Sequence, residues 1–155
     1  KNIDDREIFL NNLIEKNNKF TFNILGYANE QPKWNYQFYK EIAKCKMALN
    51  LSRGKAMKYY SSNRIASLVA NGIMTFIDNK VGYKDFFDSS EMGFYKDVDD
   101  LLNQIDKLHG NIKKIDKISK NGKKRYFSIF NNLIVSDYII SKTFNIKSKY
   151  KYIWE

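Results

Sequence analysis

The chain has 155 residues, of which 43% are hydrophobic and 15% aromatic, so it can bury one domain core and is not intrinsically disordered. Its formal charge of +10 favours an anionic partner, namely nucleic acid, an acidic membrane surface or a phosphorylated small molecule. One cysteine and one histidine exclude a disulfide framework and a Cys/His metal site. The abundance of Lys, Asn, Ile and Tyr is typical of an AT-rich genome. The net charge is therefore weaker evidence for an anionic partner.

No targeting or membrane-spanning segment is visible in the sequence. No signal peptide precedes Asp4, and polar Ser67 and Asn71 interrupt the longest apolar stretch, residues 65–77, before it reaches the roughly 20 residues of a membrane span. We expect a cytoplasmic protein, with peripheral contact with the inner face of an anionic membrane as a further expectation. Because the chain begins at Lys1, without a Met and close to a helix, we also expect a preceding strand or whole domain that this sequence lacks.

The first third of the chain predicts helix, strand, loop and helix. Asp4 is a helix cap, and apolar residues at helical spacing continue to about Asn17. Residues 20–25 are rich in β-formers, so we expect a strand there. A loop over residues 27–33 and a helix over residues 34–44 follow.

The middle of the chain predicts one parallel βαβ unit. A strand over residues 47–51 leads through a polar loop, residues 52–60, to a cluster of N-cap residue types at 61–63. A helix over residues 65–70 and a second strand over residues 73–77 complete the unit. In open α/β sheets, ligands bind outside the carboxyl ends of the strands, where helix N-termini offer N–H groups to anions. We therefore expect a ligand site at this loop.

The rest of the chain continues the alternation of elements. A helical turn is expected within residues 81–87, a strand over residues 92–95, and a helix that Asp97 caps. A further helix from Ile112 is expected to break near Gly122.

A last helix is expected around residues 133–139. Strands that alternate with helices at these lengths predict an α/β fold. We expect one Rossmann-like three-layer domain over residues 1–155, with a parallel sheet and helices on both faces.

The helix after residue 63 is apolar on nearly all sides except for one polar line. Arg64, Ser67 and Asn71 are three and four residues apart and therefore lie along one side of the helix. This line faces either solvent or a wet cleft, and the pattern alone leaves both open. In a cleft, a ligand phosphate would meet the N–H groups near Ser62 and Asn63, the helix dipole and the Arg64 guanidinium.

Three motifs follow one another around the βαβ unit: Asn50-Leu51-Ser52, Ala70-Asn71-Gly72, and a segment from Gly82 to Phe87 that precedes a strand and an acidic-capped helix. In this order, over roughly residues 4–140, they resemble the C-terminal, donor-binding half of a GT-B glycosyltransferase of the group 1 type. The resemblance implies an enzyme that transfers a sugar from an NDP-sugar donor to an unknown acceptor. It also implies an N-terminal half that is absent here, and no essential metal, because positive groups offset the charge of the leaving diphosphate.

The sequence departs from the family at two positions. Many members carry two glutamates separated by seven residues, and the second contacts the ribose of the donor. These positions fall at Tyr59 and Ser67, and neither residue is acidic. Ser67 could still hydrogen-bond a ribose hydroxyl, and Ser62-Asn63-Arg64 fits a branch of the family with a Ser-x-Arg start to this helix.

The resemblance and the loop chemistry together predict a donor site on the loop and first helical turn of the βαβ unit. Gly54 lets the backbone approach a ligand closely, and Arg53 and Arg64 supply positive charge. No residue is assigned as catalytic, and the chain is expected to transfer no sugar on its own. The expected donor-binding residues are Asn50, Ser52, Arg53, Gly54, Tyr60, Ser61, Ser62, Asn63, Arg64 and Ser67.

Several single residues have two interpretations. Trp34 and Tyr36 could stack on a base, but residues two apart do not share a helix face, which favours packing for each. Asp78 could bind a ligand hydroxyl or cap its loop. His109 is expected to be a dipole partner at a helix end, and Cys45 a small core residue.

Two other functions remain open. A basic nucleic-acid-binding module would rest on the net charge, the eleven tyrosines and the basic residues 113–125. The isoleucines between those lysines have core spacing, so we expect a solvated surface there instead of a nucleic-acid site. The third function is a degenerate Rossmann-like domain that serves assembly only, which the missing glutamates would allow.

Overall fold

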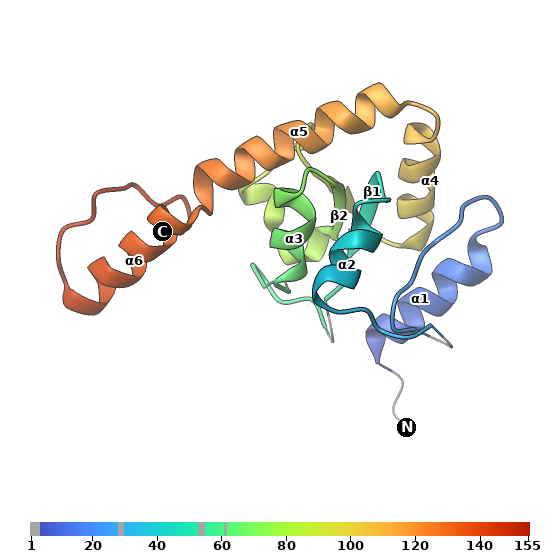
Figure 1. The fold of residues 1–155 in the computed structure, drawn as a ribbon, viewed down its shortest axis with the longest axis horizontal. Helices are drawn as coiled ribbons and strands as arrows, with labels where there is room; N and C mark the ends of the chain where they lie inside the picture. The colour runs from blue at the N-terminus through green and yellow to red at the C-terminus, as the bar shows by residue number, and fades with distance from the viewer. Residues whose placement is uncertain (1–3, 28–29, 53–54, 61) are drawn as a thin grey trace.

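The computed structural model describes residues 4–27, 30–52, 55–60 and 62–155, and its centre is a parallel sheet. The strands β1 (Met47–Asn50), β2 (Met74–Asp78) and β3 (Gly93–Tyr95) lie in the order β1-β2-β3, and both pairs are parallel. These are three of the four predicted strands. Figure 1 shows the helices arranged around this sheet, as the α/β pattern predicts.

In the described residues, six α-helices surround the sheet or follow it in the chain. Asp4 accepts a hydrogen bond from the Arg6 amide at 3.1 Å, and Asp97 accepts one from the Asp100 amide at 2.9 Å, so both predicted caps are confirmed. Two short 3-10 turns, Asn79–Val81 and Tyr83–Asp85, lie within or beside the predicted helical turn. The helices are α1 (Asp5–Lys16), α2 (Asn35–Ile42), α3 (Arg64–Ala70), α4 (Val98–Leu108), α5 (Ile112–Ile129) and α6 (Asn132–Phe144).

The central strand β2 is buried on both of its faces. Met74 and Phe76 pack into a core that α1 and α4 cover. Ile77 points to the other face, into a core formed with α3 and with Ile129 near the end of α5. Successive side chains of a strand point to opposite faces, so these two cores place helices on both sides of the sheet. The predicted three-layer arrangement is confirmed.

The predicted strand over residues 20–25 is absent from the structure, which shows an extended segment with no strand pairing. Phe20, Phe22 and Ile24 alternate inward and pack against the core under α1 and α4. The alternation of apolar and polar residues that predicted a strand therefore reflects an extended segment with one side packed on the core. A strand also needs a backbone partner, and this segment is held by side chains instead.

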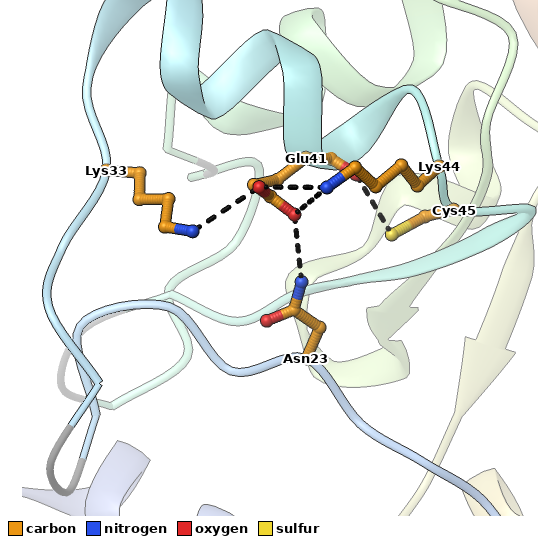
Figure 2. Close-up of polar contacts among 5 residues, drawn as sticks. All are labelled: Asn23, Lys33, Glu41, Lys44 and Cys45. Carbon is orange, nitrogen blue, oxygen red and sulfur yellow. Dashed lines mark hydrogen bonds and ion pairs between the residues drawn. The ribbon is translucent and has the colours of Figure 1, made fainter.

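Glu41 of α2 makes the main link between this segment and the helix (Figure 2). Its carboxylate accepts hydrogen bonds from Asn23 at 3.5 Å, Lys33 at 3.3 Å and Lys44 at 3.0 Å. The hydrogen bonds and charges of the lysines, Lys44 before Lys33, lower the pKa of the Glu41 carboxyl. Figure 2 also shows the Cys45 thiol against the backbone oxygen of Glu41, at 3.5 Å. The Glu41 carboxylate thus joins the extended segment, the loop before α2 and the residues that follow α2.

Three further predictions about packing are wrong. α5 runs unbroken through Gly122, because this glycine permits close packing: a Cβ there would lie 2.2 Å from the Glu91 carbonyl oxygen. Trp34 and Tyr36 do not pack into the core but are 73% and 77% exposed. The helix expected over residues 34–44 begins only at Asn35, which has a positive φ of 47°.

The chain ends in a segment that we call the C-terminal arm, residues 130–155. It consists of α6 and the tail after it, and in Figure 1 it extends from the end of α5 away from the sheet. The tail folds back on α6, where Tyr152 packs on Tyr138 with ring centroids 4.9 Å apart. In the part of the chain that the structure describes, no helix combines the length and the apolar character needed to cross a bilayer.

Candidate functional site at the carboxyl edge of the sheet

The three strands end side by side at the predicted ligand site. Asn50 is paired with Ile77, and Asp78 with Tyr95, so the last residues of the strands form one edge. The loop after β1 leaves this edge and returns to it at the start of α3. The parallel topology therefore brings Asn50, Asp78, Tyr95 and the first turn of α3 together.

Asn50 and Ser62 fasten the two ends of the loop to each other. Asn50 is 1% exposed, and its Oδ1 accepts a hydrogen bond from the Ser62 hydroxyl at 3.1 Å. A buried amide requires partners, so this contact fixes where the loop re-enters the domain. Both residues belong to the predicted donor site, and the structure brings them together.

Arg64 lies half-buried at this edge and carries an unneutralised charge. Its Nη1 donates a hydrogen bond to the Leu51 carbonyl oxygen at 3.2 Å. Burial, and then the positive charge of Arg6 in α1, lower the pKa of the guanidinium, which still remains protonated at neutral pH. Among the described residues, no carboxylate lies within ion-pair distance of Arg64. A desolvated cation without a counter-charge is suited to binding an anion.

Two hydroxyl groups at the edge have no hydrogen-bond partner in the described structure. They are Ser52 Oγ, in the loop after β1, and Tyr95 Oη, at the end of β3. Burial, and then the charge of Asp78, raise the pKa of Tyr95. Leaving a buried hydroxyl unpaired costs free energy, so each is a group that a ligand could satisfy.

The start of α3 differs from the expected capped N-terminus. Asn63 has a helical backbone conformation, is exposed and makes no side-chain cap hydrogen bond. An N-cap residue needs an extended conformation for its side chain to reach back to the next amides, so Asn63, one of the three predicted cap residues, does not cap α3. The other predicted loop residues Arg53, Gly54 and Ser61 lie outside the described residues.

The polar line on α3 does not face a single cleft. Arg64 reaches the carboxyl edge, whereas Asn71, at the other end of the helix, is exposed and donates to the Ser67 backbone oxygen at 2.6 Å. Ser67 is half-buried between them. The line thus divides between the two ends of the sheet, and only its Arg64 end belongs to the candidate site.

Tyr59, at the position of the family's first glutamate, has a structural role in the loop. It adopts a positive φ of 62°, and its amide donates to the Val81 carbonyl at 2.7 Å. Its hydroxyl donates to Asp85 at 2.6 Å, and its ring packs on Phe86. The adjacent Tyr60 is exposed. Tyr59 therefore anchors the loop to the segment after β2.

Arg6 and Tyr95 are the site residues that the sequence pattern missed. Arg6 lies one turn before Phe9, whose ring packs on Tyr95 with centroids 5.4 Å apart. No local signal in the sequence links α1 to the end of β3. The one available signal was Arg6 itself, a charged residue on the inward side of an amphipathic helix. Asp78 accepts from the Lys80 amide at 2.8 Å, so it caps its loop as one of its two interpretations expected.

Two hollows of the described surface lie away from this edge. One, of about 310 Å³, opens at the amino edge of the sheet between Ile42, Cys45 and Asn71. Burial raises the pKa of the Cys45 thiol, which suits a half-buried packing residue. A second hollow lies along the lysines of α5. Neither coincides with the candidate site.

The basic residues of α5 form a solvent-exposed face, as predicted. Lys113, Lys117 and Lys120 are exposed and line the shallow hollow named above. Arg125 differs, because its Nε donates to the Phe86 carbonyl oxygen at 2.8 Å and it is half-buried. His109 lies at the C-terminal end of α4, as predicted, and packs on Phe20.

Comparison with known proteins gives one match. No curated protein and no solved structure matches the chain. The model of a family described as glycosyl transferase-like matches residues 6–132, which include the sheet, α2 to α5, all of α1 except its first residue, and every residue of the candidate site. The chain therefore belongs to the glycosyl transferase-like family.

Proposed function

We propose that the chain binds the nucleoside diphosphate of an NDP-sugar at the carboxyl edge of the sheet, with Arg64 as the principal ligand of the diphosphate. The observation that carries the proposal is the half-buried Arg64 guanidinium, which has a carbonyl partner but no carboxylate among the described residues. A planar guanidinium binds phosphate oxygens with two parallel hydrogen bonds. Membership of a glycosyl transferase-like family supports a donor of this chemical class.

The chemistry of glycosyl transfer explains why such a cation is useful. The bond between the sugar carbon and the diphosphate oxygen breaks, and that oxygen keeps the electron pair. The acceptor hydroxyl forms the new bond to the sugar and gives up its proton to a base, which the acceptor-binding half is expected to supply. Negative charge therefore develops on the leaving diphosphate, and a fixed positive group beside it stabilises the transition state more than the ground state.

Other groups at the edge have complementary roles in this proposal. Arg6 adds positive charge near Arg64, and Ser52 offers a buried hydroxyl that needs a partner. Asn50 and Ser62 hold the loop in place through their hydrogen bond. The remaining predicted donor residues, Arg53, Gly54, Tyr60, Ser61, Asn63 and Ser67, stay in the proposal as the rest of the loop and first turn.

The test is to locate nucleotide binding by NMR. UDP and GDP are titrated into the labelled protein, and the amide shifts are mapped. We expect the largest shifts around Asn50, Ser52 and residues 62–67. Binding is the readout because transfer itself is expected to need an acceptor-binding half. Shifts confined to the lysines of α5, or equal shifts with inorganic phosphate alone, would contradict a nucleotide site at this edge.

A further inference from the structure

The exposed side of α5 carries a large share of the net positive charge of the protein. Seven of the 18 residues of this helix are Lys or Arg and one, Asp116, is acidic, so α5 contributes +6 to the formal charge of +10. Its buried side, with Ile115 and Ile118, packs into the core. The lysines occupy the remaining, exposed side. We call them the basic face: Lys113, Lys114, Lys117, Lys120, Lys123 and Lys124.

Carboxylates do not neutralise the basic face. Lysines on other elements have acidic partners, as Lys16 has in Asp99 at 2.6 Å. Asp116, the only acidic residue of α5, lies 3.9 Å from Lys46, outside the helix. Among the described residues, none of the six lysines of the basic face forms an ion pair. An AT-rich genome adds lysines to the whole chain, but it does not explain one helix face that lacks acidic partners.

The basic face begins at the amino edge of the sheet, away from the candidate donor site. Asp116 lines the hollow at the amino edge, whereas Ile129, near the other end of α5, packs in one core with Ile77 of β2. α5 therefore runs from the amino edge toward the carboxyl edge, and in Figure 1 it borders the sheet from above. Lys117, next to Asp116, lies at the opposite end of the strands from Arg64. A partner bound to this half of α5 does not cover the candidate donor site.

The shape of the basic face suits an extended anionic partner instead of a small ligand. Residues 113 and 124 are about 16 Å apart along the helix axis, so the charges form a row and do not converge on one point. Arg125, the only guanidinium of α5, donates to the Phe86 carbonyl oxygen at 2.8 Å and does not join the row. Residues 113–125 include no aromatic side chain on which a base could stack. A row of flexible lysines attracts phosphate groups without fixing their geometry, which favours a lipid surface over a nucleic acid.

We propose that the basic face of α5 binds an anionic lipid surface, with α5 lying parallel to the bilayer. Clusters of four to eight basic residues on one amphipathic helix are typical of segments that bind acidic headgroups. The buried side of α5 stays in the core, so the helix binds as a folded element through the lysine ammonium groups alone. The attraction is therefore electrostatic and sensitive to salt. The proposal does not rest on the proposed donor site, which lies at the other edge of the sheet.

Vesicle flotation measures this binding. The protein is mixed with vesicles of phosphatidylcholine alone, or with one third phosphatidylserine, at low and at high salt. We expect binding to the anionic vesicles only, and its loss at high salt. The triple variant Lys113→Gln/Lys117→Gln/Lys120→Gln should bind at least about tenfold more weakly, a factor that corresponds to about 1.4 kcal/mol. Glutamine has nearly the helix propensity of lysine, so circular dichroism should show an unchanged fold.

A matched variant separates the basic face from the net charge of the protein. Lys147→Gln/Lys149→Gln/Lys151→Gln removes the same charge from three exposed lysines of the tail and should bind nearly as the wild type does. Equal losses in the two triple variants, or no binding to anionic vesicles, would overturn the proposal. A DNA duplex at physiological salt should not displace the protein from the anionic vesicles. Displacement by the duplex that requires the α5 lysines would identify nucleic acid as the partner and would also overturn it.

Discussion

The sheet and the C-terminal arm use similar residues in opposite ways. In the sheet, Phe76 and Ile77 are buried between two helical layers, and the chain itself completes their packing. In the arm, Leu133 and Phe144 of α6 remain exposed. The same residue types therefore stabilise the fold in one region and remain on the surface of the described residues in the other.

The polar groups show the reverse contrast. In the arm, Asp137 is saturated by the tail, and the hydrogen bonds from Tyr152 and then Ser148 lower the pKa of its carboxyl. At the carboxyl edge of the sheet, Arg64 lacks a counter-charge among the described residues, and Ser52 and Tyr95 have unpaired hydroxyls. Unused polar capacity thus marks the candidate donor site, whereas unused apolar surface marks the arm.

The largest expected difference between the two regions is the cost of removing a leucine. Leu101→Ala, at a side chain that is 1% exposed, should lower the free energy of unfolding by about 2–5 kcal/mol. Leu133→Ala, in the arm, should change it by less than about 0.5 kcal/mol. Urea denaturation of both variants measures this. A loss at Leu133 as large as that at Leu101 would show that α6 packs against the protein itself.

The next effect concerns close packing of α5 on the loop before β3. Gly122→Ala places a Cβ against the backbone oxygen of Glu91, so the backbone must shift. Overpacking of this kind should cost about 1–3 kcal/mol of unfolding free energy. Gly110→Ala is a useful comparison, because nothing lies within 4 Å of its Cβ position and the only cost comes from its positive φ of 80°. A Gly122→Ala variant as stable as the wild type would contradict the close approach.

Tyrosine to phenylalanine changes should have opposite signs in the two regions. Tyr95→Phe removes an unpaired buried hydroxyl and should raise the free energy of unfolding by about 1 kcal/mol. Tyr152→Phe removes a hydroxyl that donates to Asp137 at 2.6 Å, so it should lower the melting temperature. Differential scanning calorimetry of the two variants reports both signs. Destabilisation by Tyr95→Phe would mean that its hydroxyl has a partner in the ligand-free protein.

The smallest effect is the pH dependence of the Glu41 contacts. The pKa of this carboxyl is lower in the folded protein, so its contribution exists above the unfolded pKa of about 4.3 and disappears as the pH falls through the folded pKa. Glu41→Gln should therefore melt at a lower temperature than the wild type at pH 7. The difference should shrink as the pH falls below about 4.3 and vanish once the pH is below the folded pKa. A difference that persists at low pH would assign it to packing instead of to charge.

Local chemistry predicted some elements of the fold and tertiary contacts determined others. Asp4 and Asp97 were identified as caps because a cap depends only on residues within one turn. Residues 20–25 were taken for a strand because alternation reports burial on one side but does not reveal a backbone partner. Gly122 was taken for a helix stop because its role depends on Glu91, which lies distant in sequence.

The candidate site shows the same limit. The βαβ pattern placed Asn50, Ser62 and Arg64 at one edge, since parallel topology fixes where strands end. It did not reveal Arg6 or Tyr95, because α1 and β3 reach the edge only through tertiary packing. The sequence also did not predict the exposed surface of α6. A stripe of apolar residues on a helix normally predicts a face buried in the same domain, and here that face has no such packing.

The central claim is that Arg64 binds the diphosphate of the donor, and calorimetric titration of UDP and GDP tests it most directly. Arg64→Ala should bind about ten- to a hundredfold more weakly than the wild type, because it loses charge-assisted hydrogen bonds that contribute about 1.5–3 kcal/mol and 1.4 kcal/mol corresponds to tenfold. Lys117→Ala, which removes the same charge from exposed α5, should bind as the wild type does. Melting curves confirm that both variants are folded. If folded Arg64→Ala binds as tightly as the wild type, or if Lys117→Ala loses as much affinity, the account of the donor site is contradicted.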